Sequence, residues 1–400
     1  MREVNMSDST YFDYNATTPL CSEAKDAVIS ALDVFANPSA AYQSAKYAKE
    51  ILAESRQRVA ALINAEPEQI FFTSGGTESN NWVINTVLGY LPFNASIVSS
   101  AIEHDAILDA LRGYCVQNDR QCALVAPQPN GIVDAKDLVQ PNAPGSAGFI
   151  ALMFANNETG AIQPVCEVGQ MTRDTDIFFH VDAVQAVGKI PVDVQKIGCD
   201  TLSISAHKFH GPKGVGALYV RNTERFAPWI LGGAQERGFR SGTENLPGIA
   251  GMGAAAKTAL ESLSDSFELL HNMRRRLADG LDDAGIAYTV NSPDLPYCLP
   301  NTFNLSFAGV RAEALAAYLS LKYNIEVSIG SACGNNKNTR QSHVLKAMGL
   351  DQDRINGAIR VSFGKQTQQG DIDCLIESLL ASLQQLANIS PEVNKEQCVE

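Results

Sequence analysis

One lysine in the sequence has neighbours that favour a catalytic role for its side-chain amine. Lys208 follows His207 in SISAHKFHGPKGVG, where an apolar, strand-like run ends before a glycine-rich turn. A lysine held in a crevice has a lowered pKa and can form a Schiff base with an aldehyde, whereas a solvated surface lysine is the more ordinary case. His207 and His210 could suggest zinc, but the ammonium would repel a metal ion and no third ligand lies nearby. We therefore expect no metal site.

A second segment has the composition of a phosphate site. SGGTESNN places Gly75, Gly76 and Thr77 where a strand-like run passes into a helical one. Backbone amides freed by the glycines, the threonine hydroxyl and the positive end of the helix would hold a phosphate. A plain helix cap made by Ser74 or Thr77 is the alternative. A nucleotide triphosphate is a poor fit, because the sequence has no G-x-x-x-x-G-K-[ST] motif.

A carboxylate and an imidazole complete the set. HVDAVQ places Asp182 within an apolar run, where an ionised carboxylate needs a partner. A protonated pyridine nitrogen would be one partner, and an internal salt bridge or a cap is the alternative. His104 lies at the end of another strand-like run. A phosphate cradle, a buried acid, a reactive amine and an imidazole together describe a site for pyridoxal phosphate.

These polar segments need elements that bring them together. From Ser22 to Ile190 the sequence alternates helical spacing with short apolar runs, which predicts α/β layering around a buried parallel sheet. Ligands of such sheets gather at the carboxyl ends of the strands, so polar segments that follow the runs are expected at one crevice. The segments that do so are SGGTES, SAIEHDA, ANNETG, HVDAVQ and SAHK.

The second half of the sequence predicts a different architecture. A helical stretch over roughly 247–280 is followed, from Ala287, by strand-like segments mixed with the amphipathic helices RAEALAAYLSLKY and DIDCLIESLLASLQQL. This mixture predicts a smaller α+β unit. We expect an N-terminal arm over 1–20 that packs with the small domain, a large cofactor-binding domain over 21–262 and a small domain over 263–400.

Composition narrows the classes of function. Hydrophobic residues make up 45% of the 400 residues, and no apolar run approaches the roughly 18 to 20 residues that a membrane span needs. The net charge of −13 argues against a broad basic face for nucleic acid. The nine scattered cysteines include no C-x-x-C pair, which fits reduced thiols. The first residues lack the pattern of a secretory signal, so we expect a cytoplasmic enzyme without membrane or direct nucleic-acid partners.

Taken in order along the chain, the motifs resemble one family. The sequence is similar to the fold-type I pyridoxal-phosphate enzymes of aminotransferase class V, and specifically to the cysteine desulfurases. The resemblance implies an α/β fold in which helices flank a mostly parallel seven-stranded sheet, with a small α+β domain beside it. The matching segments are YFDYNATTP, FANPS, FFTSGGTESNN, AIEHDA, ANNETGAIQP, HVDAVQAVGK, SAHKFHGPKGVG, FRSGTEN, GSACG and IRVSFG.

The resemblance assigns roles around the cofactor ring. Lys208 would hold the aldehyde of pyridoxal 5'-phosphate, and Asp182 would pair with the ring nitrogen. Asn157 and Gln185 would lie on the side of the ring oxygen. His104 would lie over the ring face and would be a candidate proton shuttle.

The resemblance also assigns residues to the binding of the cofactor phosphate and of the substrate. Arg360, with Asn157, would bind the substrate carboxylate, a task that suits a planar, two-pronged donor. Thr243 would complete the phosphate site of a neighbouring subunit, which implies a homodimer with shared active sites. The phosphate of the same chain would be bound by Gly76, Thr77, Ser205 and His207.

The reaction depends on one thiol. Cys333 lies in a polar stretch rich in glycine and asparagine, SIGSACGNNKNTRQSHVL. A buried, inert cysteine is the usual case. In this family, however, such a thiol takes the sulfur of L-cysteine as a persulfide, leaves L-alanine and passes the sulfur to an acceptor protein.

Two departures from the family bear on the sulfur acceptor. Tyr42 stands in the region where many relatives have a histidine after N-P-S-S, and the residues after Cys333 lack the usual Thr/Ser-rich sequence. These departures favour a dedicated pathway such as DNA phosphorothioation over the general supply of iron–sulfur clusters or tRNA thiolation. An aminotransferase, a selenocysteine lyase and a non-catalytic sulfur-relay protein are the competing functions.

Overall fold

The computed structural model describes residues 9–140, 148–329 and 341–389. Its largest sheet consists of β2 (Ile70–Thr73), β3 (Ser96–Ser100), β4 (Ala123–Val125), β5 (Gly148–Met153), β6 (Ile177–Asp182), β7 (Thr201–Ser205) and β8 (Gly216–Val220). Within the described chain these seven strands lie in the order β2-β8-β7-β6-β5-β3-β4. β8 is antiparallel to both of its neighbours, and the other pairings are parallel. The prediction of a mostly parallel seven-stranded sheet is confirmed.

Both faces of this sheet are buried, which explains its continuous apolar strands. In β5, Phe149 and Ala151 belong to one apolar cluster, and Ile150 and Leu152 belong to the cluster on the opposite face. The helices that contribute to the first cluster are α3 (Gly76–Tyr90) and α4 (Asp105–Gln117). The second cluster receives side chains from α2 (Ser44–Leu62), α5 (Ala135–Val139), α6 (Val165–Thr172), α7 (Val194–Ile197) and α8 (Leu246–Glu261).

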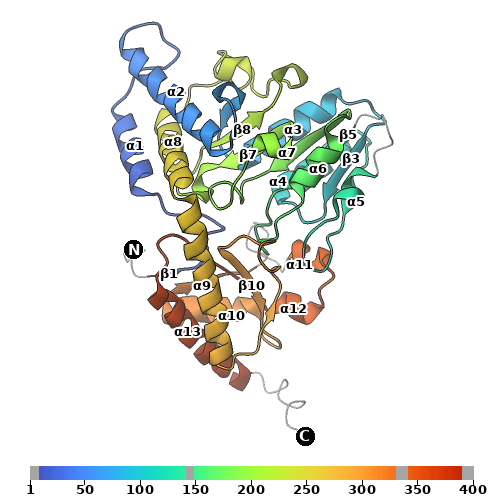
Figure 1. Ribbon diagram of the computed structural model, residues 1–400, viewed down its shortest axis with the longest axis vertical. Coiled ribbons are helices and arrows are strands. Elements are labelled where there is room, and N and C mark those ends of the chain that lie inside the picture. Colours follow the sequence, from blue (N-terminus) through green and yellow to red (C-terminus); the bar gives the residue numbers. More distant parts are fainter. Residues whose placement is uncertain (1–8, 141–147, 330–340, 390–400) are drawn as a thin grey trace.

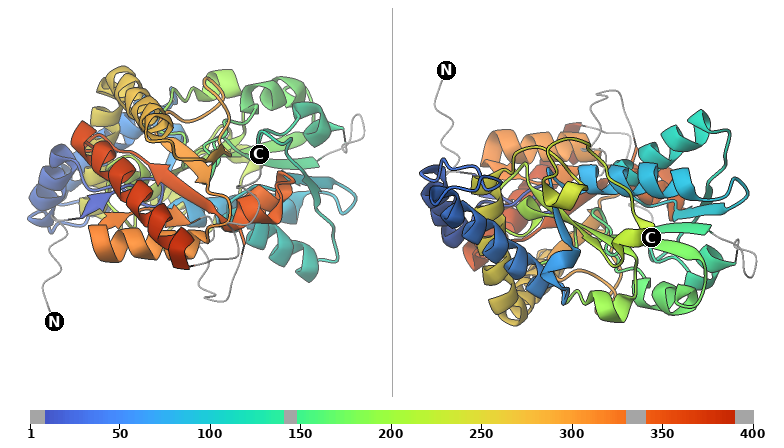
Figure 2. Two further views of the ribbon diagram at one scale, coloured as in Figure 1. Left: turned by 90° about the horizontal axis from the view of Figure 1, so that it is seen from below. Right: turned by 90° about the horizontal axis from the view of Figure 1, so that it is seen from above.

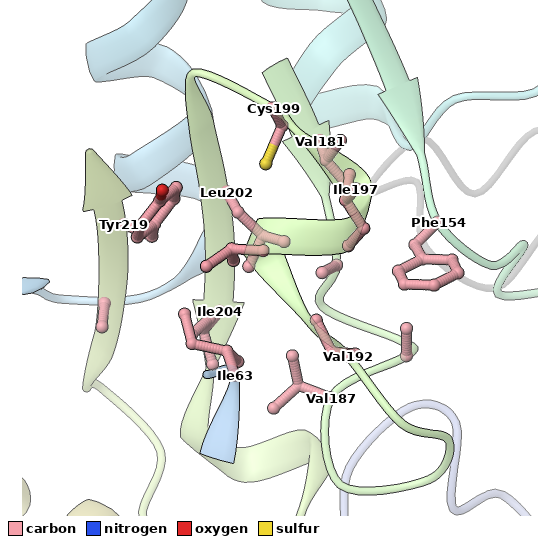
Figure 3. Packing of buried hydrophobic residues seen from close by; sticks show 14 of the residues in the cluster. Ile63, Phe154, Val181, Val187, Val192, Ile197, Cys199, Leu202, Ile204 and Tyr219 are labelled. Carbon is pink, nitrogen blue, oxygen red and sulfur yellow. The ribbon is translucent and has the colours of Figure 1, made fainter. Parts of the chain in front are cut away.

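The second cluster also fixes the strands that carry the candidate site. Figure 3 shows Val181 of β6 and Leu202 and Ile204 of β7 packed among Ile63 and Val187. All five side chains are essentially inaccessible to solvent. The residues that directly follow β6 and β7 therefore project from a rigid base.

Two successive helices join the large sheet to the rest of the chain. α8 packs against α1 (Ser22–Leu32) and α2, and α9 (Leu263–Asp283) then runs away from the large sheet (Figure 1). Ser262 ends α8 and begins α9. The predicted helical stretch over roughly 247–280 is thus present, but it consists of two helices that meet at Ser262.

A smaller antiparallel sheet forms the other end of the molecule. Its order is β12 (Ser328–Ile329), β13 (Ala358–Ser362), β10 (Thr302–Ser306) and β9 (Thr289–Val290). α9 and α13 (Gln369–Ile389) pack side by side and, with α10 (Ala312–Tyr318), supply the apolar side chains of its core (Figure 2). The short helices α11 (His343–Ala347) and α12 (Gln352–Asn356) precede β13.

The first described residues join this smaller unit. β1 (Thr10–Tyr11) pairs in parallel with β11 (Ile325–Glu326), and Phe12 is buried in the core beneath the small sheet. That core shares no residue with the clusters of the large sheet. The domain boundaries stay a prediction. Among the described residues, no helix is both long enough and apolar enough to cross a membrane.

Candidate active site

A cavity of about 510 Å³ lies at the carboxyl ends of β2, β3, β5, β6 and β7. This volume is in the usual range for a small-molecule site. The segment that follows β1 and the small-sheet strand β13 contribute the remaining wall. Among the predicted site residues, those that line the cavity are Gly76, Thr77, His104, Asn157, Asp182, Gln185, Ser205, His207, Lys208 and Arg360.

Two predicted residues stand apart from this group. Thr243 is exposed and is not among the residues that line the cavity. Its proposed role is in a neighbouring subunit, which a single chain does not test. Cys333 lies outside the described residues.

Lys208 ends a short 3₁₀ helix, Ala206–Lys208, that follows β7 directly. Its Nζ donates hydrogen bonds to the backbone oxygens of Asn15, at 2.6 Å, and Ala16, at 2.9 Å. Both acceptors lie in the segment after β1, and both line the cavity. The amine is therefore held at the cavity wall and is not a solvated surface lysine.

Asp182 is the last residue of β6 and is 6% exposed. Its Oδ2 accepts a hydrogen bond from Asn80 Nδ2 at 2.7 Å, and its Oδ1 accepts one from the backbone N–H of Val184 at 3.0 Å. In the described part of the chain no lysine, arginine or histidine forms an ion pair with it. The internal salt bridge considered from the sequence is thus not found there, and the carboxylate is held by neutral donors.

A relay of buried side chains fixes the partner of Asp182. Because the Asn80 amide nitrogen faces Asp182, its Oδ1 accepts from His180 Nε2 at 3.0 Å. His180 Nδ1 then accepts from the hydroxyl of Thr201 at 2.9 Å. Burial lowers the pKa of His180 to about 3, so its imidazole is neutral. This chain of donors locks the orientation of the Asp182 carboxylate.

The amino end of α3 has the features of an anion cradle. Gly75 adopts φ +155° and Gly76 begins the helix, with no side-chain cap. The capping alternative for Ser74 or Thr77 is therefore not what the structure shows. A Cβ on Gly76 would lie 2.5 Å from Val184 Cγ2, so only glycine fits this approach. Gly75 and Gly76 both line the cavity, and neither carries a Cβ that would separate the start of α3 from a ligand.

Positive charge is concentrated near His207, which lines the cavity together with Gly75 and Gly76. His207 Nδ1 is 3.2 Å from Thr17 Oγ1. Burial, and then the positive charges of Lys208 and of two further lysines, lower the pKa of His207 to about 4. An excess of positive charge that depresses the protonation of an imidazole is the environment that an anionic ligand relieves.

Glu78, in the first turn of α3, is a second acid in the lining of the cavity beside Asp182. Burial acts to raise its pKa, but the guanidinium of Arg240 and the amide of Ser74 outweigh burial, and the pKa is lowered overall. Arg240 Nε and Nη2 donate to the two carboxylate oxygens at 2.8 and 3.1 Å. This pair ties the segment that precedes Thr243 to the start of α3.

His104 is half-buried and caps α4. Its Nδ1 accepts a hydrogen bond from the backbone N–H of Ala106 at 3.0 Å. With Nδ1 serving as an acceptor, Nε2 is the ring nitrogen that carries or exchanges a proton. The cap fixes the tautomer and the residue lines the cavity, so His104 can act as a proton shuttle.

Arg360 lies in the middle of β13 and is 4% exposed. Its Nη1 donates to the backbone oxygen of Asn157 at 2.8 Å, and its Nη2 forms an ion pair with Asp13. The Nε has no partner in the described residues. Arg360 is therefore a buried arginine and not a surface one, and its guanidinium retains an N–H group for a carboxylate ligand.

Three contributors to the site were not singled out from the sequence: Asn15, Asn80 and Lys189. Gln185 Nε2 donates to the backbone oxygen of Asn15 at 2.9 Å, and Lys189 Nζ donates to Gln185 Oε1 at 2.6 Å. All three lie within matching segments, Asn15 in YFDYNATTP, Asn80 in FFTSGGTESNN and Lys189 in HVDAVQAVGK, and that place is the signal that could have identified them.

The residues present fit pyridoxal phosphate. The glycines at the start of α3 would suit the phosphate, and the amine of Lys208 at the wall would suit the aldehyde. The buried Asp182 carboxylate, without a cationic partner in the described chain, would suit the protonated ring nitrogen. Comparison with known proteins decides the family. The sequence model of the family described as aminotransferase class V matches residues 10–375 of this chain.

The chain belongs to the class-V aminotransferase family. It is 38% identical over 395 residues to a protein named cysteine desulfurase IscS from Methanosarcina thermophila, covering 97% of this chain and 95% of the relative. A solved NifS-like protein superposes with a TM-score of 0.86 at 36% identity over 94% of this chain and 100% of its own. A structure of SspA in complex with cysteine gives a TM-score of 0.75 at 32% identity, over 88% and 98% of the two chains. The predicted resemblance to the cysteine desulfurases of this family and the fold-type I architecture are confirmed.

Proposed function

We propose that this enzyme binds pyridoxal 5'-phosphate and converts L-cysteine to L-alanine, with the sulfur taken as a persulfide on Cys333 and passed to an acceptor protein. One observation carries the proposal. A single cavity holds the Lys208 amine, the buried Asp182 carboxylate, the Gly76 cradle and the Arg360 guanidinium. These are groups for an aldehyde, a pyridine nitrogen, a phosphate and a carboxylate.

When bound, pyridoxal phosphate supplies a ring that accepts the electrons released at the α-carbon of an amino acid. The protein supplies positioning and proton transfer. Asp182, held by Asn80, keeps the ring nitrogen protonated. Arg360 binds and orients the substrate carboxylate, and Lys208 Nζ and His104 Nε2 are the groups that hold or move protons in the cavity.

The overall reaction balances without an external oxidant. L-cysteine and the Cys333 thiol give L-alanine and the Cys333 persulfide. The carbon–sulfur bond of the substrate breaks, a sulfur–sulfur bond forms at Cys333, and the thiol proton passes to the alanine product. The acceptor protein then receives the outer sulfur of the persulfide.

Finer features of the proposal come from the sequence motifs, and some of them have support in the structure. A homodimer in which Thr243 completes the partner's phosphate site is supported by the exposure of Thr243 and by its link to α3 through Arg240. An arm over 1–20, a large domain over 21–262 and a small domain over 263–400 are supported by the separate apolar cores. A cytoplasmic location and a dedicated acceptor, such as one for DNA phosphorothioation, stay predictions.

Replacement of Cys333 by serine tests the function. We expect Cys333→Ser to lose sulfide release from L-cysteine while it keeps the visible absorbance of bound cofactor at about 400–420 nm. Cys374→Ser is the matched control, because Cys374 is an exposed cysteine on α13 outside the cavity. If Cys333→Ser turned over L-cysteine as fast as the wild type, an aminotransferase or a lyase would be favoured. A wild-type protein without that absorbance would favour a non-catalytic relay.

A further inference from the structure

Lys189 is a buried lysine beside the cavity that the proposed reaction does not use. It lies in the turn after β6 and is 7% exposed. Its Nζ donates to Gln185 Oε1 at 2.6 Å and to Asn15 Oδ1 at 2.9 Å. Both acceptors are neutral amide oxygens, and within the described residues no carboxylate pairs with the lysine. A buried amine without a counter-ion is costly, so its retention needs a reason.

The two acceptors of Lys189 are themselves part of the cavity wall. Gln185 and Asn15 both line the cavity. Gln185 Nε2 donates to the backbone oxygen of Asn15 at 2.9 Å, and the same oxygen accepts from Lys208 Nζ at 2.6 Å. A continuous set of hydrogen bonds therefore links Lys189 through Gln185 and Asn15 to the amine at position 208.

The N–H groups of Lys189 set the orientation of the Gln185 amide and, together with Asn301 Nδ2, which donates to Asn15 Oδ1 at 3.0 Å, that of the Asn15 amide. An amide presents an oxygen at one end and an NH₂ group at the other. Because Lys189 Nζ meets the oxygen of Gln185, the Gln185 NH₂ group is the end that donates to the backbone oxygen of Asn15 at 2.9 Å, and its second N–H is left for a ligand in the cavity that Gln185 lines. Because Lys189 also meets the oxygen of Asn15, the Asn15 NH₂ group is left to donate to the backbone oxygen of Asn157 at 3.2 Å and to Thr302 Oγ1 at 2.8 Å.

We infer that Lys189 is a positioning residue of the active site, which holds the Gln185 amide so that it offers a donor to the cofactor and holds Asn15 so that it supports Lys208. This inference rests on the proposed cofactor site. Burial, and then the charges of Lys208 and Arg360, lower the pKa of Lys189 well below its usual value. Even a neutral amine keeps two N–H donors, which match the two amide oxygens.

A structural role and a positioning role differ in what they predict for the apoenzyme. A lysine that only stabilises the fold would lower the stability of the apoenzyme when it is removed. A buried lysine without a counter-ion stabilises the fold little, because an apolar side chain of similar length avoids the desolvation cost. Lys189→Met also leaves Gln185 Oε1 without its donor, a cost that opposes this gain. We therefore expect a small net change in the unfolding midpoint of the apoenzyme and a larger effect on the bound cofactor.

The test is titration of purified apoenzyme with pyridoxal 5'-phosphate, followed by visible absorbance. We expect Lys189→Met to weaken cofactor binding by about tenfold and to shift the absorption band, and Gln185→Leu to do the same. The Lys189→Met/Gln185→Leu double variant should lose little more than either single variant, since both act through one amide. Losses that multiply, or a Lys189→Met enzyme that binds and absorbs like the wild type, would overturn the inference.

Two further measurements distinguish a failure of the proposed function from a failure of the inference about Lys189. If the wild-type chain itself fails to bind pyridoxal phosphate, the proposed function fails, whereas wild-type binding with an unaltered Lys189→Met titration removes only the inference. Should Lys189→Met fail to fold, Lys189→Gln takes its place, because a neutral amide retains N–H donors. We expect Lys189→Gln to bind the cofactor within about threefold of the wild type, and a loss of tenfold or more would contradict the donor role.

Discussion

Arg360, which lines the cavity, forms an ion pair with Asp13, although 347 positions separate the two residues in the chain. The Arg360 side chain is 4% exposed and that of Asp13 is 20% exposed. An isolated parallel bridge between Asp13 and Ser362 brings the segment after β1 beside β13. A substrate carboxylate that reaches Arg360 therefore meets a guanidinium whose charge Asp13 already shares.

Removal of the Asp13 charge should tighten the binding of carboxylate substrates. In a partly exposed site the lost repulsion is worth about 1 kcal/mol, so we expect Asp13→Asn to lower the KM for L-cysteine by about fivefold. The kcat should change little, because the effect falls on ground-state binding. Steady-state kinetics measure both constants. Asp373→Asn is the control, since Asp373 pairs with Arg276 away from the cavity, and a KM that rises in Asp13→Asn would show that Asp13 chiefly orients the arginine.

The phosphate cradle predicts a contrast between two glycines of the same helix. An alanine at Gly76 would place its Cβ 2.5 Å from Val184 Cγ2, whereas an alanine at Gly89 would meet nothing within 4 Å. We expect Gly76→Ala to weaken pyridoxal-phosphate binding by more than about tenfold. Gly89→Ala should leave binding unchanged and should stabilise α3 by up to about 1 kcal/mol. Equal cofactor affinities in the two variants, measured by absorbance titration, would argue against phosphate at this helix end.

His180 predicts part of the acid sensitivity of the fold. Burial lowers its pKa from 6.5 to about 3, so between these values the unfolded chain binds a proton that the native state does not. The stabilising contribution is complete above about pH 6.5 and is lost as the pH falls toward 3. One proton corresponds to about 1.4 kcal/mol per pH unit, and His207 acts with the same sign.

The variant His180→Gln isolates this contribution. Urea unfolding of the apoenzyme at about pH 7 and about pH 5 should show that the variant loses less free energy of unfolding than the wild type over this interval. The remaining loss reflects His207 and the carboxylates. Identical losses in the two proteins would mean that His180 is not kept neutral by the fold.

The strands and the residues that directly follow them could be predicted because their signals are local. β5 and β6 are apolar runs that fill both faces of the sheet, and Asp182 and Lys208 stand where the polar residues begin. Burial of a charged residue at such a boundary is unusual in any sequence, so each position called for a chemical explanation. The order of these boundaries along the chain is what led to the prediction of a pyridoxal-phosphate site.

The supporting contacts could not be predicted, because they join distant segments. Lys189 follows the apolar AVG, as a surface cation could, and its burial against Asn15 joins segments that are 174 positions apart. The ion pair of Asp13 with Arg360 depends likewise on how the small sheet meets the segment after β1. Such contacts follow from the packing of whole elements, for which local periodicity carries no signal.

Glu103, next to the candidate proton shuttle, gives the last prediction. It is fully buried, and its Oε1 accepts from the hydroxyl of Ser100 and from the backbone N–H of Met153. Its Oε2 has no partner within the described residues. Burial raises its pKa to about 8, opposed by the hydrogen bonds from Ser100 and Met153. The fold therefore keeps this acid protonated, and its contribution to stability is complete below about pH 4.5 and is lost as the pH rises through about 8.

Glutamine imitates the protonated acid and removes its titration. We expect the free energy of unfolding of Glu103→Gln to match that of the wild type near pH 4.5 and to exceed it progressively above that pH. At about pH 8 the difference should reach up to about 4 kcal/mol. Urea unfolding of the two apoenzymes across this range measures the difference directly. Because only a carboxyl that is neutral in the fold and ionised in the unfolded chain gives a gap that widens with pH, parallel curves would show that Glu103 is ionised in the native protein.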